Sequence, residues 1–237
     1  LLNKNPFYDA EKEIKPPAKV SLFISHAKHD GETEAKNFRD YVRKTTKLNT
    51  FFDVNDIADG YRFDTQIEDA VMDGNSALVV FHSDAYAARE WCQIEVLTAK
   101  RFKSPIVLVH NITRGEKRSF PYLGNIPTIK FLNDNFEDII DLTLFQVLIN
   151  IFHKLNLEKV TKLFVGKDKN MFELLSTPPE LVNFRDLLTI KAEKASGKSF
   201  SVIYPDPPLG NAELKVLEEM KSSMRFLTPI QLSALIK

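Results

Sequence analysis

The stretch ALVVFHSDAYAAREWCQIEVLTAK, residues 77–100, contains the pattern that decides the fold. It opens with an uninterrupted apolar run, Ala77 to Phe81, and continues with residues that favour a helix. A short apolar run without alternation is typical of a strand buried on both faces of a parallel sheet, and a helix usually connects such a strand to the next one. The stretch therefore predicts a strand that ends at His82 and Ser83, followed directly by a helix that runs to about Lys100.

Strand-like and helix-like segments alternate on both sides of this stretch. Apolar, β-favouring runs predict four further strands, at Lys19 to Ser25, Asn49 to Phe52, Pro105 to Val109 and Thr128 to Phe131. Apolar residues at helical spacing predict helices at Gly31 to Thr45, Asp64 to Met72 and about Phe136 to Leu155. In the last of these, one apolar stripe is expected, formed by Ile140, Leu144, Val147, Leu148 and Ile151.

Five strands separated by helices predict an α/β fold. Because crossovers between parallel strands are right-handed, the helices cover both faces of a parallel sheet in turn. The expected strand order is the flavodoxin-like one, in which ligands bind beyond the carboxyl ends of the strands near the switch point. The loops at that edge would be 25–31, 53–61 and the segment from His82 onward.

The last third of the chain has a different character. Phe200 to Tyr204 predicts a strand, PDPPLG at 205–210 a stiff turn, and Thr228-Pro229 the start of a helix. We therefore expect a smaller C-terminal α/β appendage. The predicted organisation is an N-terminal extension over 1–17, a main domain over 18–157 and an accessory or partial regulatory region over 158–237.

Composition limits the classes of function. Thirty-two basic and 32 acidic residues among 237 leave no net charge, which argues against nucleic acid and anionic membrane as partners. A single cysteine, Cys92, cannot form an internal disulfide, and no apolar run approaches the ~20 residues that span a bilayer. We expect a globular cytoplasmic protein. Since the chain lacks an initial Met and stops inside an apolar, helix-like segment, we also expect an excerpt of a longer protein.

One aromatic and one acidic residue stand out on the helix after Ser83. Trp91 and Glu95 are four residues apart, so they share a helix face and can meet one ligand. A carboxylate beside an indole is costly to bury unless a cationic or hydrogen-bonding group meets it, which indicates a site. The simpler interpretation is that Glu95 is solvated and Trp91 only packs.

Four histidines, His26, His29, His82 and His110, fall at or just after predicted strand ends. No spacing typical of metal ligands accompanies them, and Cys92 is expected to be a buried helix residue. We therefore predict no metal site.

With these residues in view, Lys19 to about Leu155 resembles a Toll/interleukin-1 receptor (TIR) domain. KVSLFISHAKHDG is similar to the first strand and loop of that family, and FFDVNDIADGYRF is similar to its second strand and long BB loop. ALVVFHSDAY is similar to the third strand. WCQIE is similar to the segment that joins a tryptophan to a glutamate in the NAD+-cleaving branch of the family. That branch includes bacterial defence proteins, plant resistance proteins and the animal axon-degeneration protein. The BB loop here reads IADG and lacks the proline common in receptor adaptors, which also favours the enzymatic branch.

The resemblance implies a role for each site residue. Glu95 would be catalytic, with Ser25, His26, Phe63, Ser83 and Trp91 as substrate contacts and with Asp53 and Gly60 in a BB loop that docks on a neighbouring subunit. Several simpler roles stay open: Ser83 as a helix N-cap, Phe63 as a core residue, and Asp53 and Gly60 as ordinary turn residues.

The function that the resemblance implies is NAD+ glycohydrolase activity, with NAD+ as substrate and no cofactor. Nicotinamide is cationic in NAD+ and leaves neutral, so one carboxylate suffices where ordinary glycosides need two. The products would be nicotinamide and either ADP-ribose or a cyclic isomer, in a bacterial defence effector activated by self-association. Expected partners are other TIR domains and a sensor domain or protein reached through the C-terminal region. The alternative is a non-catalytic TIR–TIR interaction module.

Overall fold

The structure is a computed structural model. It describes residues 20–52, 76–116, 120–123, 126–132, 134–160, 172–175, 178–180, 200–220 and 224–235. The N-terminal extension 1–17 and the helix expected at 64–72 lie outside these residues. So do three of the expected site residues, Asp53, Gly60 and Phe63, and their roles stay predictions.

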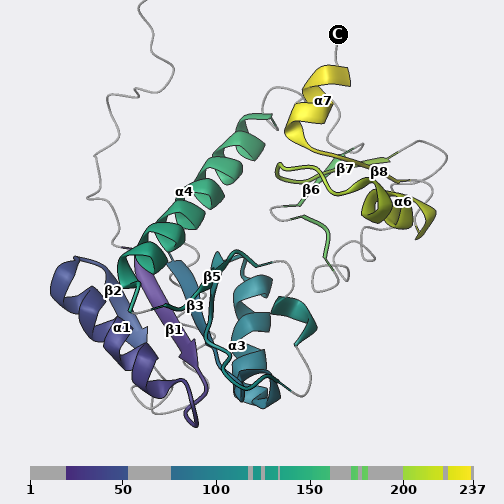
Figure 1. Cartoon of the computed structure of the whole chain (residues 1–237). Coiled ribbons are helices and arrows are strands. Elements are labelled where there is room, and N and C mark those ends of the chain that lie inside the picture. Colours follow the sequence, from purple (N-terminus) through teal and green to yellow (C-terminus); the bar gives the residue numbers. More distant parts are fainter. Residues whose placement is uncertain are drawn as a thin grey trace, which may run out of the picture.

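A five-stranded parallel sheet is the larger of the two sheets in the described chain (Figure 1). Its strands are β1 (Ser21–His26), β2 (Asn49–Phe52), β3 (Ser76–His82), β4 (Ile106–His110) and β5 (Thr128–Lys130). Their order in the sheet is β2-β1-β3-β4-β5, which confirms the flavodoxin-like order predicted from the sequence. The first and last residues of each strand lie within two residues of the prediction. Strands that are covered on both faces need uninterrupted apolar runs, and such runs can be recognised directly in the sequence.

Helices cover both faces of this sheet. Side chains of a strand alternate between the two faces, so neighbours on β1 enter different cores. Leu22 packs in the core made with α1 (Glu32–Thr45) and α4 (Phe136–Val160). Phe23 packs in the core made with α3 (Glu90–Arg101) and two short 3-10 turns, η2 (Tyr86–Ala88) and η3 (Pro121–Leu123). The sequence-based expectation of helices on both faces is confirmed.

The helix expected directly after β3 begins later than predicted. The N–H of Tyr86 donates to the carbonyl of Ser83 at 3.0 Å, and the N–H of Ala85 donates to the Asp30 carboxylate at 2.8 Å. These bonds hold the chain in a turn that continues into η2. Arg89 is then extended, with φ −92° and ψ 114°, so α3 starts only at Glu90. The sequence could not indicate this, because the residue that fixes the turn comes from the loop after β1.

Helix α4 differs from its prediction in two respects. It has 25 residues and continues five residues past Leu155, to Val160. The expected apolar stripe is right for Ile140 and Val147, which are buried, but wrong for Leu148, which is 63% exposed. Successive helix residues are about 100° apart, so Leu148 turns away from the core that Val147 enters.

A second, three-stranded parallel sheet lies in the C-terminal part of the chain (Figure 1). It has the order β6-β7-β8, with β6 (Phe172–Leu174), β7 (Phe200–Ile203) and β8 (Met224–Leu227). Two helices pack on it, α6 (Asn211–Met220) and α7 (Pro229–Leu235). The N–H of Gln231 donates to the Thr228 hydroxyl at 3.4 Å, and the Gln231 side chain accepts from the Thr228 N–H at 2.9 Å. This reciprocal cap confirms the helix start predicted at Thr228-Pro229.

Helix α4 belongs to the cores of both sheets. Val147 packs against the large sheet, whereas Leu157, ten residues on, packs with Ile203 of β7 and Leu232 of α7. The boundary expected between 157 and 158 falls inside this helix, and the division of the chain into domains stays a prediction. None of the helices in the described part of the chain combines the length and the apolar character that a bilayer crossing needs.

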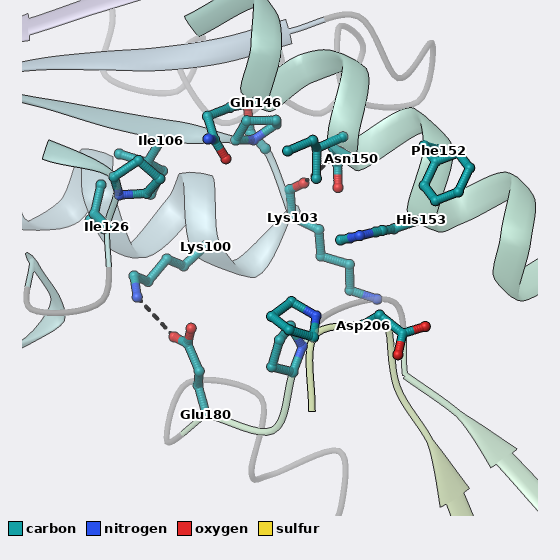
Figure 2. Close-up of a pocket in the computed structure, with 16 residues that line it drawn as sticks. Lys100, Lys103, Ile106, Ile126, Gln146, Asn150, Phe152, His153, Glu180 and Asp206 are labelled. Atoms are coloured by element: carbon teal, nitrogen blue, oxygen red, sulfur yellow. Dashed lines mark hydrogen bonds and ion pairs between the residues drawn. The ribbon is translucent and has the colours of Figure 1, made fainter. Parts of the chain in front are cut away.

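A cavity of about 740 Å³ lies where the end of α3, α4 and the chain around Asp206 meet (Figure 2). Most of its lining is apolar, with Ile106, Ile149 and Phe152 among the residues that form it. Lys100 of α3 forms an ion pair with Glu180 at 2.8 Å on one side of it. None of the expected site residues that the structure describes, which are Ser25, His26, Ser83, Trp91 and Glu95, lines this cavity.

Candidate functional site

The expected site lies at the edge of the large sheet where the strands end. In the sheet register His26 of β1 is paired with Phe81 of β3, and His82 of β3 with His110 of β4. Ser25, His26 and His82 are therefore brought to the same edge. The chain leaves β1 toward α1 on one face and leaves β3 toward α3 on the other, which makes this edge the switch point of the sheet.

Glu95 lies in the second turn of α3 and is only 7% exposed. Its carboxylate accepts a hydrogen bond from the hydroxyl of Ser25, at the end of β1. Trp91, four residues earlier, is 40% exposed. The interpretation of Glu95 as a solvated helix residue is therefore wrong, whereas the role of Trp91 stays a prediction. α3 presents a buried, hydrogen-bonded carboxylate one turn after a partly exposed indole.

Tyr86 extends this contact into a chain of three side chains. Its hydroxyl lies 2.5 Å from Ser25 Oγ, and the whole residue is buried. Because the Ser25 proton is donated to Glu95, the Tyr86 hydroxyl must be the donor to Ser25. Burial, followed by the nearby Glu95 carboxylate and the Cys92 thiol, raises the pKa of the Tyr86 phenol well above its usual value. The phenol is therefore a neutral donor across the physiological pH range.

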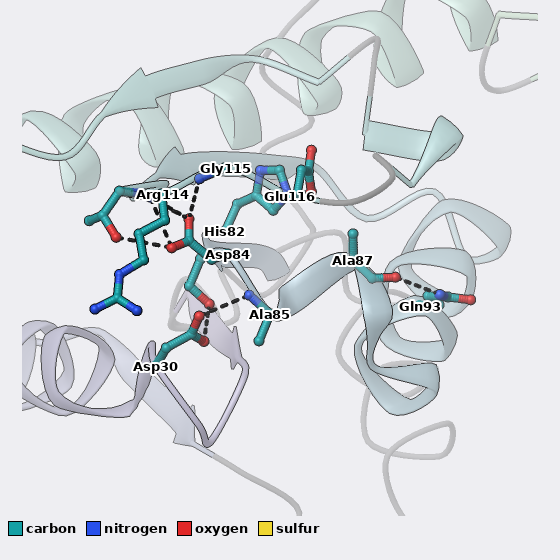
Figure 3. A network of polar contacts seen from close by, with 11 residues as sticks. Asp30, His82, Asp84, Ala85, Ala87, Gln93, Arg114, Gly115 and Glu116 are labelled. Atoms are coloured by element: carbon teal, nitrogen blue, oxygen red, sulfur yellow. Dashed lines mark hydrogen bonds and ion pairs between the residues drawn. The ribbon is translucent and has the colours of Figure 1, made fainter.

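A second network joins the loop after β1 to the turn after β3 (Figure 3). The Ser83 hydroxyl donates to Asp30 Oδ1 at 2.6 Å, and the Ala85 N–H donates to Asp30 Oδ2 at 2.8 Å. Ser83 is 1% exposed. The N-cap role considered for Ser83 is wrong, since the residue before α3 is Arg89 and no side chain caps that helix. Ser83 instead fixes the position of the turn relative to β1.

Asp84 holds the loop after β4 (Figure 3). Its carboxylate accepts hydrogen bonds from the backbone N–H groups of Thr113 at 2.9 Å, Arg114 at 3.0 Å and Gly115 at 3.2 Å. Gly115 has φ +106°, a conformation that favours glycine. Burial raises the pKa of the Asp84 carboxyl, but these donors and the Thr113 hydroxyl outweigh it and hold that pKa below its usual value.

The side chains of His82 and His110 contact each other at this edge, and His82 also contacts an acidic side chain. His82 Nε2 lies 3.0 Å from Glu116 Oε2, and the two side chains are only 6% and 12% exposed. The His82 ring also meets the ring of His110 edge-on, with centroids 5.8 Å apart. Among the residues that the structure describes, no three His, Cys, Asp or Glu side chains are grouped so that they could hold a metal ion.

His26 and Cys92 form the packing beneath the site. The ring of His26 stacks on Phe52 of β2, with centroids 4.7 Å apart and planes 15° apart. The Cys92 thiol is 3.5 Å from the carbonyl oxygen of His26, and Cys92 is 4% exposed. The prediction that Cys92 is a buried helix residue is confirmed. His26 is 8% exposed, so its ring lies mainly against β2.

The structure brings together two of the predicted site residues, Ser25 and Glu95, and places Ser83 in the adjacent network. Sequence reasoning missed Tyr86, Asp30 and Asp84. Asp30 lies in the segment SHAKHDG, residues 25–31. Aspartate side chains in loops often accept hydrogen bonds from backbone N–H groups, so the residue type alone could have marked Asp30 as a candidate. No local pattern marks Tyr86, because its partner Ser25 is 61 residues away.

Comparison with known proteins agrees with this architecture. A family model described as "TIR domain" matches residues 22–143, which is more than half of the chain. No curated protein matches the chain. The match begins in β1, includes Ser25, Tyr86 and Glu95, and ends within α4. On this match, the chain belongs to the TIR domain family.

Proposed function

We propose that this chain is an NAD+ glycohydrolase in which Glu95 is the catalytic residue. The observation that supports the proposal is the burial of the Glu95 carboxylate at the switch point of the sheet, where Ser25 donates a hydrogen bond to it. A carboxylate is costly to bury, and a fold has no structural need for one at the edge where doubly wound sheets bind ligands. TIR domains include enzymes that cleave NAD+, which is the second support.

The reaction requires one group that stabilises positive charge. The C1′–N bond between ribose and nicotinamide breaks, and its electron pair neutralises the pyridinium nitrogen. The ribose then carries the charge of an oxocarbenium ion, which the Glu95 carboxylate stabilises. Attack by water, with loss of one proton to solvent, gives ADP-ribose, whereas attack by an adenine nitrogen gives a cyclic isomer. No general acid is needed, because nicotinamide leaves as a neutral molecule.

The neighbours of Glu95 take supporting roles in this proposal. Ser25 and Tyr86 are positioning residues, since their hydroxyl groups form a chain that ends on the carboxylate. Trp91 keeps the role expected from the sequence, that of an aromatic surface that shields the ribose or the nicotinamide from water. Its exposure of 40% leaves the indole accessible to a ligand.

Self-association is the second element of the proposal. TIR domains in general associate with one another, and we propose that contact between subunits activates the enzyme, in a defence effector whose free form is only weakly active. The physical motive is that constitutive cleavage of NAD+ harms the cell that makes the enzyme. The accessory C-terminal region would then regulate the TIR domain or connect it to a sensor.

The direct test follows nicotinamide release from NAD+ at high protein concentration. Glu95→Gln keeps the size of the side chain and its ability to accept from Ser25, but removes the negative charge. We expect activity to fall by roughly a thousandfold, the scale for removing a central electrostatic group. Glu90→Gln is the matched control, because Glu90 is on the same helix but exposed. The control should keep full activity.

The alternative function is a TIR–TIR interaction module without catalysis. An unchanged NAD+ pool, with the assembled protein shown to be present by light scattering, would contradict the enzymatic proposal and favour this alternative. Partner binding would then be insensitive to Glu95→Gln. It would depend instead on the loop 53–61, where Gly60→Pro is the informative substitution.

A further inference from the structure

The cavity between α3, α4 and Asp206 has a line of polar side chains along one wall. Three residues of α4, which we call the α4 polar line, face it: Gln146, Asn150 and His153. Their spacing of four and three residues places them on one face of the helix, and Figure 2 shows them projecting from α4 toward the cavity. A helix that only packs against apolar neighbours presents apolar side chains to them, so packing does not explain this line.

Most of the hydrogen-bonding capacity of the α4 polar line is unused within the described chain. The Asn150 amide donates one hydrogen bond, to the carbonyl oxygen of Lys103 at 3.4 Å. No other hydrogen bond joins the side chains of Gln146, Asn150 or His153 to a described residue. All three are half-buried, and each amide offers two N–H groups and one carbonyl oxygen. The line can therefore meet a ligand group that both donates and accepts.

The charged groups around the cavity balance one another. Lys100 is paired with Glu180 at 2.8 Å, and Lys103 and Asp206 supply one further charge of each sign. Both carboxylate oxygens of Asp206 are buried, and no group in the described chain donates a hydrogen bond to either. A charged ligand would be attracted by one of Lys103 and Asp206 and repelled by the other. The cavity therefore suits a ligand without charge.

His153 does not alter this balance at neutral pH. Burial lowers the pKa of its imidazole below the ordinary value of 6.5, and the nearby Asp206 carboxylate offsets only part of this effect. The ring is therefore neutral. A neutral imidazole has one N–H that donates and one nitrogen that accepts, so His153 resembles the two amides in what it offers to a ligand.

We propose that this cavity binds an uncharged aromatic or heteroaromatic amide. Its ring would pack against apolar walls that include Ile106 and Ile126, and its amide group would meet the α4 polar line. The volume of about 740 Å³ is in the usual range for small-molecule sites, and such sites combine mostly apolar walls with a few polar groups. The inference does not rest on the proposed NAD+ cleavage, because neither Glu95 nor Ser25 lines this cavity.

The first experiment compares three probes of the same planar shape. Benzamide is uncharged, benzoate is anionic and benzamidine is cationic at neutral pH. Each is titrated into the isotope-labelled full chain, and nuclear magnetic resonance follows the side-chain amide signals of Gln146 and Asn150. We expect benzamide to bind at least about tenfold more tightly than either charged probe, because each of these meets a like charge at Lys103 or Asp206.

The other results of this comparison would overturn the proposal. Preference for benzoate would mean that Lys103 determines the ligand, and preference for benzamidine would give that role to Asp206. Binding of none of the three probes would mean that the cavity holds only water. Benzamide shifts confined to the surroundings of Glu95, with the α4 polar line unaffected, would assign the binding to the other site.

Substitutions on α4 test the contacts. Gln146→Leu and Asn150→Leu remove the amides, so each should raise the dissociation constant of benzamide by about threefold to tenfold, the effect of one lost hydrogen bond. Gln146→Leu is the cleaner of the two, because Asn150→Leu also removes the bond to the Lys103 carbonyl. Asn156→Leu is the matched control: Asn156 is half-buried on the same helix and does not line the cavity. Its affinity for benzamide should equal that of the unchanged protein.

Two further variants separate this cavity from the proposed catalytic site. Ile149→Trp places a large ring in the cavity and should abolish benzamide binding, while circular dichroism shows that the chain still folds. Glu95→Gln should leave the shifts of the α4 polar line and the dissociation constant of benzamide unchanged. Undiminished binding in a folded Ile149→Trp variant, or equal affinities in Gln146→Leu and the unchanged protein, would contradict the assignment.

Discussion

Ser25 on β1 donates its hydroxyl proton to the carboxylate of Glu95 on α3, which joins two residues 70 positions apart at the carboxyl edge of the sheet. The carboxylate is therefore fixed from the strand rather than by its own helix. The Tyr86 phenol donates to Ser25 in turn, so the three side chains form one chain of hydrogen bonds. A change at any of them alters the position or charge of the same carboxylate.

Ser25→Ala should lower activity without removing the catalytic group. Glu95 loses the donor that orients it, and we expect kcat to fall by about tenfold to a hundredfold with little change in KM, the usual cost of losing an orienting partner. Ser25→Thr keeps the hydroxyl and should restore most of the rate. The measurement is the steady-state rate of nicotinamide release.

Ser76→Ala is the matched control for this substitution. Ser76 is 2% exposed at the opposite end of the sheet, on β3, and its hydroxyl lies 3.3 Å from that of Ser104. Loss of either serine should reduce the free energy of unfolding by about 1 kcal/mol, but only Ser25→Ala should reduce activity. Equal effects on activity would show that the role of Ser25 is purely structural.

Tyr86 should make the folded protein sensitive to alkali. The pKa of its phenol is raised above the ordinary value of 10.0, so the folded state holds this proton while the unfolded chain loses it. The stabilising contribution of the protonated phenol is complete below pH 10 and is lost as the pH rises toward the folded-state pKa. Tyr86→Phe should remove this part of the pH dependence. Urea unfolding at a series of pH values above 9 measures it, and an unchanged profile in Tyr86→Phe would count against the assignment.

Asp84 should have the opposite pH dependence. The pKa of its carboxyl is lowered below the ordinary value of 3.8, so the contribution of the carboxylate is complete above that pH and is lost as the pH falls through the folded-state pKa. Asp84→Asn should release the loop 113–115, whose backbone N–H groups lose their charged acceptor. Hydrogen exchange should become faster at Thr113, Arg114 and Gly115. Unchanged protection of these amides would contradict the role given to Asp84.

Leu157 connects α4 to the small sheet and should be essential for its packing. Leu157→Ala removes a side chain that is 7% exposed and leaves a cavity against Ile203 and Leu232, at a cost of about 2–5 kcal/mol. Val216→Ala, at an exposed position of α6, should change stability by less than about 0.5 kcal/mol. Hydrogen exchange of β7 and β8 should quicken while β1 and β3 keep their protection. Uniform loss of protection in both sheets would mean instead that the chain unfolds as one unit.

The strands and their order could be predicted from the sequence because the signal for a buried parallel strand is local. Glu95 could be selected because its spacing from Trp91 is also local. The start of α3 could not be predicted, since the turn before it is fixed by Asp30, which is 55 residues from Ala85. The periodicity of apolar residues carries no information about a partner so far away in the chain.

The two errors on α4 have a common physical cause. Periodicity identifies an apolar face but not what covers it, and α4 has apolar residues on more than one side. Leu148 therefore looked like a core residue although it is exposed. The end of the helix was placed too early because Leu157 packs with Ile203 of β7 and Leu232 of α7, which come much later in the chain.

The continuity of α4 has a mechanical consequence. A helix of 25 residues is about 37 Å long and resists bending, and here its two ends are anchored in different hydrophobic cores. The small sheet therefore cannot tilt without tilting the helix that lies against β3 and β4. A force applied to the small sheet is therefore transmitted along α4 to the face of the large sheet that α1 and α4 cover.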